Sequence, residues 1–207
     1  DLLEKHRGVA ADADVDRLWR RALRNRALVA YSRGDLQAAA QAWRGVLDLD
    51  PSDGLAHTYL AAALVDRGRL DEAMAHYAEA LRLRPDFEEA HNAFGNALIQ
   101  QGKLDEAIGR YRQALRLRPD YAAAYSNLGA ALLQQGAVAQ AIDSLTEALR
   151  LKPAYATAHN NLGNALVLNG EPQEAIAHYR EALRLKSDYG AASRNLARLL
   201  AHSDTQE

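Results

Sequence analysis

The sequence contains no cysteine, so disulfide bonds, thiol catalysis and cysteine-based metal sites are excluded. Aromatic residues make up only 6% of the chain, and no apolar run approaches the roughly 18 residues of a membrane-spanning helix. A net charge of −2 gives no general attraction for nucleic acid or anionic membranes. The abundant alanine, leucine and arginine instead predict an all-α protein with a thin apolar core.

The most prominent feature of the sequence is self-similarity at a period of 34 residues. A fixed period of this length predicts a solenoid, in which each unit buries its apolar face by stacking on its neighbours. The period is carried by the glycines Gly34, Gly68, Gly102, Gly136 and Gly170, the prolines Pro51, Pro85, Pro119 and Pro153, and the alanines Ala39, Ala73, Ala107, Ala141 and Ala175.

Each period has the pattern of two short helices. In residues 88–121 the first helix has apolar or small residues at i, i+3, i+4 and i+7 from His91. Gly102 suits the left-handed residue that ends it, and Pro119 cannot continue the second helix. Asp105 and Glu106 stand in the first turn of that second helix, where the helix dipole favours negative charge. The pattern therefore predicts one antiparallel helix pair per repeat.

Three glycines, Gly95, Gly129 and Gly163, lie inside the first helices. Glycine is less favourable than alanine at such positions by about 1 kcal/mol, so another reason for their presence is needed. We interpret them as places where the two helices of a pair approach closely. The partner positions are the small residues Ala107, Ala141 and Ala175, and the large side chains expected around these contacts are Trp43, Tyr77, Tyr111, Leu145 and Tyr179.

The motif Leu128-Gly129, Leu132, Gly136, Ala141, Leu145, Ala148 and Pro153 resembles the tetratricopeptide repeat. The resemblance implies an all-α, right-handed superhelical solenoid of antiparallel helix pairs, with a concave groove lined by the first helices. We expect one domain at 14–201, preceded by a leader at 1–13 and followed by a disordered tail at 202–207. Within it we place repeats at 20–53, 54–87, 88–121, 122–155 and 156–189, and a capping helix at 190–201.

The first repeat is atypical. Its long first helix, from about Asp14, is expected to bury Leu18, Trp19, Ala22, Leu23 and Ala27. It also carries a cluster of arginines, which we interpret as a solvated face of the helix. The alternative is that these arginines bind an acidic partner or phosphates. The cluster consists of Arg17, Arg20, Arg21, Arg24, Arg26 and Arg33.

Asparagines recur on the first helices at positions that the apolar core does not use. An amide donates and accepts, so it can match the backbone of an extended peptide whatever its side chains. The pattern is similar to the asparagine ladder of O-linked N-acetylglucosamine transferases, although solvated asparagines would give it too. The predicted peptide-binding residues are Tyr59, Asn92, Asn96, Asn127, Asn160, Asn161, Asn164, Arg194, Asn195 and Arg198.

Catalytic patterns are weak. His57, His91 and His159 share one repeat position with Tyr125, which indicates packing residues, and His76 and His178 are too far apart in the repeats to form one site. No phosphate-binding loop or metal-ligand spacing occurs. We expect no cofactor, no metal and no enzymatic activity.

The resulting prediction is a non-catalytic scaffold that binds a protein or extended peptide in its concave groove, with no nucleic acid and no membrane span. One alternative is a substrate-targeting module of a larger enzyme, such as a glycosyltransferase or methyltransferase. Another is a structural scaffold that self-associates. A cytoplasmic location is the expectation for such a protein.

Overall fold

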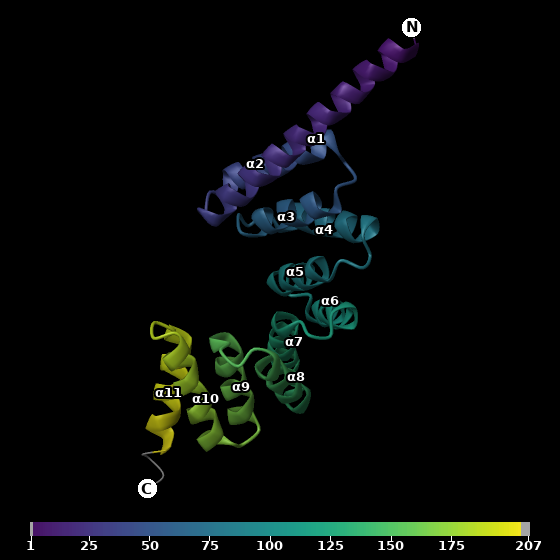
Figure 1. The fold of residues 1–207 in the computed structure, drawn as a ribbon. Coiled ribbons are helices and arrows are strands. Elements are labelled where there is room, and N and C mark those ends of the chain that lie inside the picture. The colour runs from purple at the N-terminus through teal and green to yellow at the C-terminus, as the bar shows by residue number, and fades with distance from the viewer. Residues whose placement is uncertain (1, 204–207) are drawn as a thin grey trace. The chain divides into compact units, whose positions relative to one another are not determined.

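The computed structural model describes the backbone of residues 2–203 and the side chains of residues 14–201. In this part of the chain all regular elements are helices, joined by short turns, and they follow one another in pairs (Figure 1). The helices are α1 (Leu2–Ser32), α2 (Leu36–Leu49), α3 (Gly54–Val65), α4 (Leu70–Leu83), α5 (Glu88–Gln100), α6 (Leu104–Leu117), α7 (Ala122–Gln135), α8 (Val138–Leu151), α9 (Ala156–Leu168), α10 (Pro172–Leu185) and α11 (Gly190–Ser203). The predicted all-α solenoid is confirmed.

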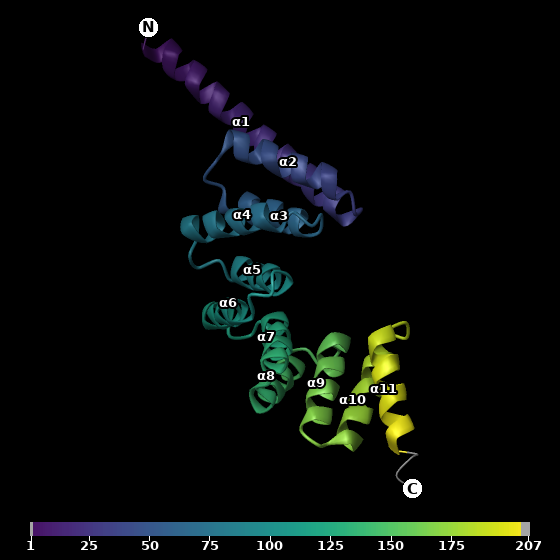
Figure 2. The ribbon, with the colours of Figure 1, turned by 180° about the vertical axis from the view of Figure 1, so that it is seen from behind.

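The chain forms two compact units, Asp1–Ala97 and Leu98–Glu207, and the boundary between them falls inside α5. In the first unit α1 packs on α2, α2 on α3, and α3 on α4. In the second unit the helices from α6 to α11 each pack on the next, as both ribbon views show for α7 to α11 (Figures 1 and 2). The first helices α7, α9 and α11 also contact one another in turn.

The turn inside each helix pair depends on glycine. Gly136 has φ +83°, in the left-handed region that a side chain disfavours, and its N–H bonds to the carbonyl of Leu133 at 3.1 Å. The next amide, of Ala137, bonds back to the Leu132 carbonyl at 2.9 Å, which closes the helix end. The prediction is confirmed at all five periodic positions, because φ is positive at Gly34, Gly68, Gly102, Gly136 and Gly170.

The glycines inside the first helices allow a close approach of two helices. A Cβ atom on Gly129 would lie 2.5 Å from Leu145 Cγ and 3.2 Å from the Ala141 carbonyl oxygen. A Cβ on Gly163 would lie 2.6 Å from Cε1 of Tyr179. The two carbon–carbon distances, 2.5 and 2.6 Å, are shorter than a carbon–carbon contact permits, so the sequence-based interpretation is confirmed for α7 with α8 and for α9 with α10.

The same large side chains fill the core of successive repeats. Trp43, Tyr77, Tyr111, Leu145 and Tyr179 occupy one repeat position and are all buried, as predicted. In the first unit the Trp43 ring stacks on Tyr59 with the ring centroids 5.1 Å apart. Most of the other buried residues are alanine or leucine, so the core of the described residues has few aromatic side chains.

Helix α1 differs from the prediction in two ways. It begins at Leu2, so the structure has no break between the proposed leader and the first repeat. Leu18 and Trp19, predicted to be buried, are 62% and 61% exposed, and Ala22 is also exposed. The reason is length, because α1 has 31 residues and α2, which packs on it, has only 14. Ala27, nearer the end of α1, is buried as predicted.

Two of the clustered arginines on α1 form ion pairs with acidic residues between α2 and α3. Arg20 pairs with Asp50 at 2.6 Å, and Arg24 pairs with Asp53, whose side chain is 6% exposed. Asp53 in turn accepts the amides of Leu55 and Ala56 at the start of α3. These arginines therefore have structural partners, which the solvated-face interpretation did not foresee.

The C-terminal helix α11 covers the end of the fifth repeat. Leu196 and Leu199 pack on the buried cluster that contains Leu166, Ala175 and Tyr179. Helix α11 extends to Ser203, two residues beyond the predicted capping helix. The remaining part of the predicted tail, residues 204–207, lies outside the described residues.

Candidate peptide-binding site

Three of the predicted asparagines meet between α9 and α11 in the second unit. Asn160 and Asn164 lie one turn apart on α9, and Asn195 lies on the neighbouring helix α11. The Asn195 Nδ2 donates to Asn160 Oδ1 at 3.1 Å and to Asn164 Oδ1 at 2.9 Å. Asn164 Oδ1 also accepts the hydroxyl of Tyr179, on α10, at 2.8 Å. The amides thus form a network that joins α9, α10 and α11.

This network borders a pocket of about 390 Å³, a volume within the range of small ligand sites. Its walls are largely apolar, and Leu168, 64% exposed, stands at the edge. The polar side chains of the lining are few and come from α9, α10 and α11. The pocket is lined by Asn164, Val167, Leu168, Tyr179, Asn195, Arg198 and Leu199.

The amides retain hydrogen-bonding capacity toward this pocket. Among the described residues, Asn195 Oδ1 accepts no hydrogen bond and Asn164 Nδ2 donates none. Burial raises the pKa of the Tyr179 hydroxyl, and nearby Arg198 opposes the shift, so this hydroxyl stays a donor at neutral pH. One acceptor and one donor next to an apolar hollow can bind a peptide group beside an apolar side chain.

The other predicted residues lie elsewhere. Asn161 is half-buried on α9 and accepts a hydrogen bond from Asn160 at 3.3 Å. Asn160 itself is only 4% exposed, so its amide serves the network and not the pocket. Asn127 is half-buried on α7 and Arg194 is exposed on α11.

In the first unit, Tyr59 is 37% exposed on α3 and covers Trp43. The two predicted asparagines on α5 differ in exposure, because Asn92 is only 8% exposed whereas Asn96 is exposed. Only Asn164, Asn195 and Arg198 of the predicted set therefore line the pocket.

The apolar wall of the pocket was missed from the sequence. Leu168 occupies a repeat position that holds Asp66, Gln100 and Gln134 in the three preceding repeats. That change from polar to apolar was the available signal. Its meaning depends on α11, since only the contact of α9 with α11 turns this exposed leucine into a wall.

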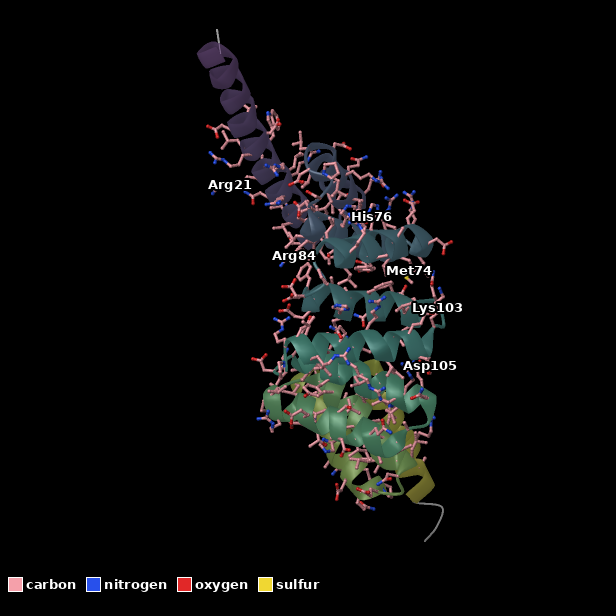
Figure 3. The ribbon with its side chains drawn as sticks, turned by 90° about the vertical axis from the view of Figure 1, so that its right-hand side faces the viewer. Arg21, Met74, His76, Arg84, Lys103 and Asp105 are labelled. Carbon is pink, nitrogen blue, oxygen red and sulfur yellow. The ribbon has the colours of Figure 1, made fainter. Side chains whose placement is uncertain are left out.

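Two histidine pairs form a second polar feature. His57 on α3 and His76 on α4 have their Nδ1 atoms 2.8 Å apart, and Figure 3 labels His76. His57 Nε2 lies 3.1 Å from the Pro51 carbonyl oxygen, which only accepts. In the neutral pair His57 therefore carries its proton on Nε2, and the Nδ1–H of His76 donates to His57 Nδ1. The fifth repeat has the same arrangement, with His159 and His178 at 2.9 Å and His159 at 2.9 Å from Pro153.

The histidine positions follow the repeat but the pairing was not foreseen. The predicted packing role of His57 and His91 agrees with their burial, at 9% and 5% exposed. His76 and His178 each pair with a histidine of their own repeat, 19 residues earlier on the facing helix. The interaction crosses a helix pair, so spacing along one helix could not indicate it.

These pairs predict loss of stability in mild acid. The pKa of His76 is lowered by burial, by His57 and by Arg44, while Glu72 opposes the shift. Asp48 and Glu79 also border this pair. The pKa of His178 is lowered by burial and by His159, against Glu181. Because the native state then binds fewer protons than the unfolded state below about pH 6.5, the free energy of unfolding should fall as the pH drops through that value.

Urea denaturation at pH 7.5 and at pH 5.0, followed by circular dichroism, measures this effect. In the double variant His76→Gln and His178→Gln the difference in unfolding free energy between the two pH values should shrink, because these two histidines no longer titrate. It should not vanish, since carboxylates that titrate in both proteins remain. An equal difference in both proteins would contradict the role of the histidine pairs.

Two further observations concern the described residues. Among residues 14–201, whose side chains the structure describes, no group of three or more histidine or acidic side chains is arranged to hold a metal ion. No helix of the described part has the length and apolar character needed to span a bilayer.

Comparison with protein families matches the repeats directly. A TPR repeat family matches residues 61–98, 95–136 and 131–170, which together span more than half of the chain, and the tetratricopeptide repeat family matches residues 156–189. The chain therefore belongs to the tetratricopeptide repeat family. No curated protein matches it significantly over its sequence.

Several solved structures share the fold. PilF of Pseudomonas aeruginosa is 24% identical with a TM-score of 0.82, covering 92% of this chain and 87% of PilF. MamA of Desulfovibrio magneticus RS-1 is 21% identical with a TM-score of 0.70, covering 83% of this chain and 97% of that one. YrrB, described as a TPR protein with an unusual peptide-binding site, is 20% identical with a TM-score of 0.65, covering 83% and 89%. At these identities the likeness concerns the fold alone.

Proposed function

We propose that this protein is a non-catalytic interaction module that binds an extended segment of a partner protein along its first helices. The observation that carries the proposal is the pocket between α9 and α11, which combines an apolar hollow with the amides of Asn164 and Asn195. An apolar side chain of the partner would enter the hollow, and a peptide group beside it would bind the two amides. The peptide-binding description of YrrB supports the same kind of ligand.

The geometry of helical repeats sets the spacing of such contacts. Neighbouring helices lie about 8–10 Å apart, and an extended chain advances about 3.3 Å per residue. One first helix therefore meets about every third residue of the partner. Each amide contact contributes only about 0.5–1.5 kcal/mol, so the apolar side chain in the pocket is expected to be the main anchor.

Selection of peptides from a random library on the full chain, followed by calorimetry of a selected peptide, tests this proposal. Leu168→Gln places in α9 the residue that Gln134 provides in α7, and it removes one apolar wall without disturbing the core, since Leu168 is 64% exposed. Loss of that wall should weaken binding roughly five- to tenfold.

Gln134→Leu is the matched control. It adds an apolar side chain at the equivalent repeat position of α7, which does not line the pocket, and should leave the affinity of the selected peptide unchanged. Selected peptides that bind Leu168→Gln as tightly as the original chain would place the site elsewhere. A library that yields no binding peptide would contradict the proposed class of ligand.

A further inference from the structure

The lining of the pocket between α9 and α11 carries charge of one sign. Arg198 is the only charged residue among the seven that line it. It is exposed and lies three residues after Asn195, about one turn along the same side of α11. Burial raises the pKa of the Tyr179 hydroxyl and Arg198 opposes that shift, so the positive charge acts on groups inside the pocket. Such a lining favours a ligand that carries negative charge.

The first helices of this unit supply no acidic side chain. The sequences of α7, α9 and α11, which contact one another in turn, contain no aspartate or glutamate. Their only arginines or lysines are Arg194 and Arg198, one turn apart on α11. The second helices α8 and α10 instead carry both signs of charge. The lysine, arginine and acidic side chains of these first helices are therefore all basic, and all lie beside the pocket helix α9.

Two acidic residues come within three positions of a lining residue in the sequence, and both have partners of their own. Glu171 follows the end of α9, does not line the pocket, and accepts a hydrogen bond from the side chain of Asn169. Glu181 is two residues after Tyr179 on α10 and pairs with Arg184 at 2.7 Å. Residues three and four positions before and after Tyr179 are uncharged. Neither carboxylate therefore makes the lining of the pocket acidic.

We propose that the partner segment carries an aspartate or glutamate next to the apolar side chain that enters the pocket, and that Arg198 binds this carboxylate. This inference rests on the proposed function, since it takes an extended segment to occupy the pocket. The planar guanidinium can donate two parallel hydrogen bonds to one carboxylate. Arg198 is then the residue that selects acidic segments among those that share an apolar anchor.

The carboxylate belongs to a side chain and not to the end of the partner chain. Among the described residues Asn195 Oδ1 accepts no hydrogen bond and Asn164 Nδ2 donates none. A peptide group supplies both the N–H and the carbonyl that these two amides need. A terminal carboxylate at the same place would bring its oxygens against the oxygen of Asn195. The main chain therefore continues through the site, and a side chain beside it provides the negative charge.

The peptides selected on the full chain give the first measurement. The random sequences are displayed with a blocked carboxyl terminus, so that acidic side chains are their only carboxylates. Aspartate or glutamate should be enriched within two residues of a shared apolar residue, and lysine and arginine should be depleted. Selection on Arg198→Gln should retain the apolar residue and lose the acidic enrichment.

A selected peptide and its variant with glutamine in place of the acidic residue quantify the contact by calorimetry. The glutamine peptide should bind the original chain about three- to tenfold more weakly. On Arg198→Gln the two peptides should bind within about twofold of each other, because the charge partner is gone. Arg112→Gln is the matched control. It removes the same charge from an exposed position of α6 that does not line the pocket, so the full difference should remain.

Failure of this inference is distinct from failure of the proposed function. Selected peptides that lose affinity for Leu168→Gln but show no acidic preference, or keep that preference on Arg198→Gln, would overturn the role of Arg198 alone. A library without binders, or binders that are insensitive to Leu168→Gln, would overturn the proposed function and this inference with it. A peptide without acidic side chains whose free carboxyl terminus gives the same Arg198-dependent gain would assign the charge to the chain end, which also overturns the inference.

Discussion

Replacement of Gly129 by leucine should lower the free energy of unfolding by about 3 kcal/mol or more. The first added carbon alone would lie 2.5 Å from Leu145 Cγ and 3.2 Å from the carbonyl oxygen of Ala141. The Leu145 side chain is fully buried, and the Ala141 carbonyl is part of the backbone of α8. Neither group can therefore move away without disturbing the helix pair. The cost of overpacking exceeds the gain of about 1 kcal/mol that a side chain normally provides over glycine in a helix.

Gly109→Leu is the matched control for that experiment. Gly109 also lies inside a helix, α6, but nothing stands within 4 Å of the Cβ it would acquire. The same substitution should therefore stabilise the protein slightly, by up to about 1 kcal/mol. Urea denaturation of both variants gives the comparison. A change of the same sign in both would show that α7 and α8 do not approach as closely as the coordinates place them.

Replacement of Trp43 by alanine should cost about 3–5 kcal/mol of stability in the first unit. Its side chain is 1% exposed and stacks on Tyr59 with the ring centroids 5.1 Å apart. Removal of the indole leaves a cavity that rigid helix backbones cannot close. Circular dichroism during denaturation follows the loss, which also tests whether repeats unfold in separate steps.

Trp19→Ala provides the comparison for Trp43. The same change at a side chain that is 61% exposed should alter stability by less than about 0.5 kcal/mol. A large loss of stability in Trp19→Ala would mean that this tryptophan is buried in solution, against its described position. The two tryptophans thus test where the core of the first repeat ends.

Much of the fold could be predicted from the repeat itself. The recurrence of Gly136 and its equivalents fixes where each first helix ends, because only glycine adopts this left-handed conformation without strain. The glycine at 129 opposite the alanine at 141 indicated a close helix pair before any coordinates were known. Periodicity is sufficient for such features, because each arises from contacts within one repeat.

The candidate site could be predicted only in part, since it depends on contacts between repeats. Asn164 and Asn195 were identified as exposed amides, but the hydrogen bonds that join them, and the burial of Asn160 at 4% exposed, follow from the approach of α9 and α11. Leu168 became part of a pocket for the same reason. An amide that bonds to another amide has less capacity for a ligand, and the one-dimensional pattern does not distinguish the two cases.

The sequence by itself determined the repeat length, the all-α solenoid, the helix ends and the close packing inside helix pairs. Each of these follows from backbone conformation and side-chain size over a few tens of residues. The tertiary structure alone decided that His57 pairs with His76, that Arg24 pairs with Asp53, and that Trp19 is exposed. These outcomes depend on which side chains two different helices bring together, and on how far one helix extends past another, neither of which spacing along the chain specifies.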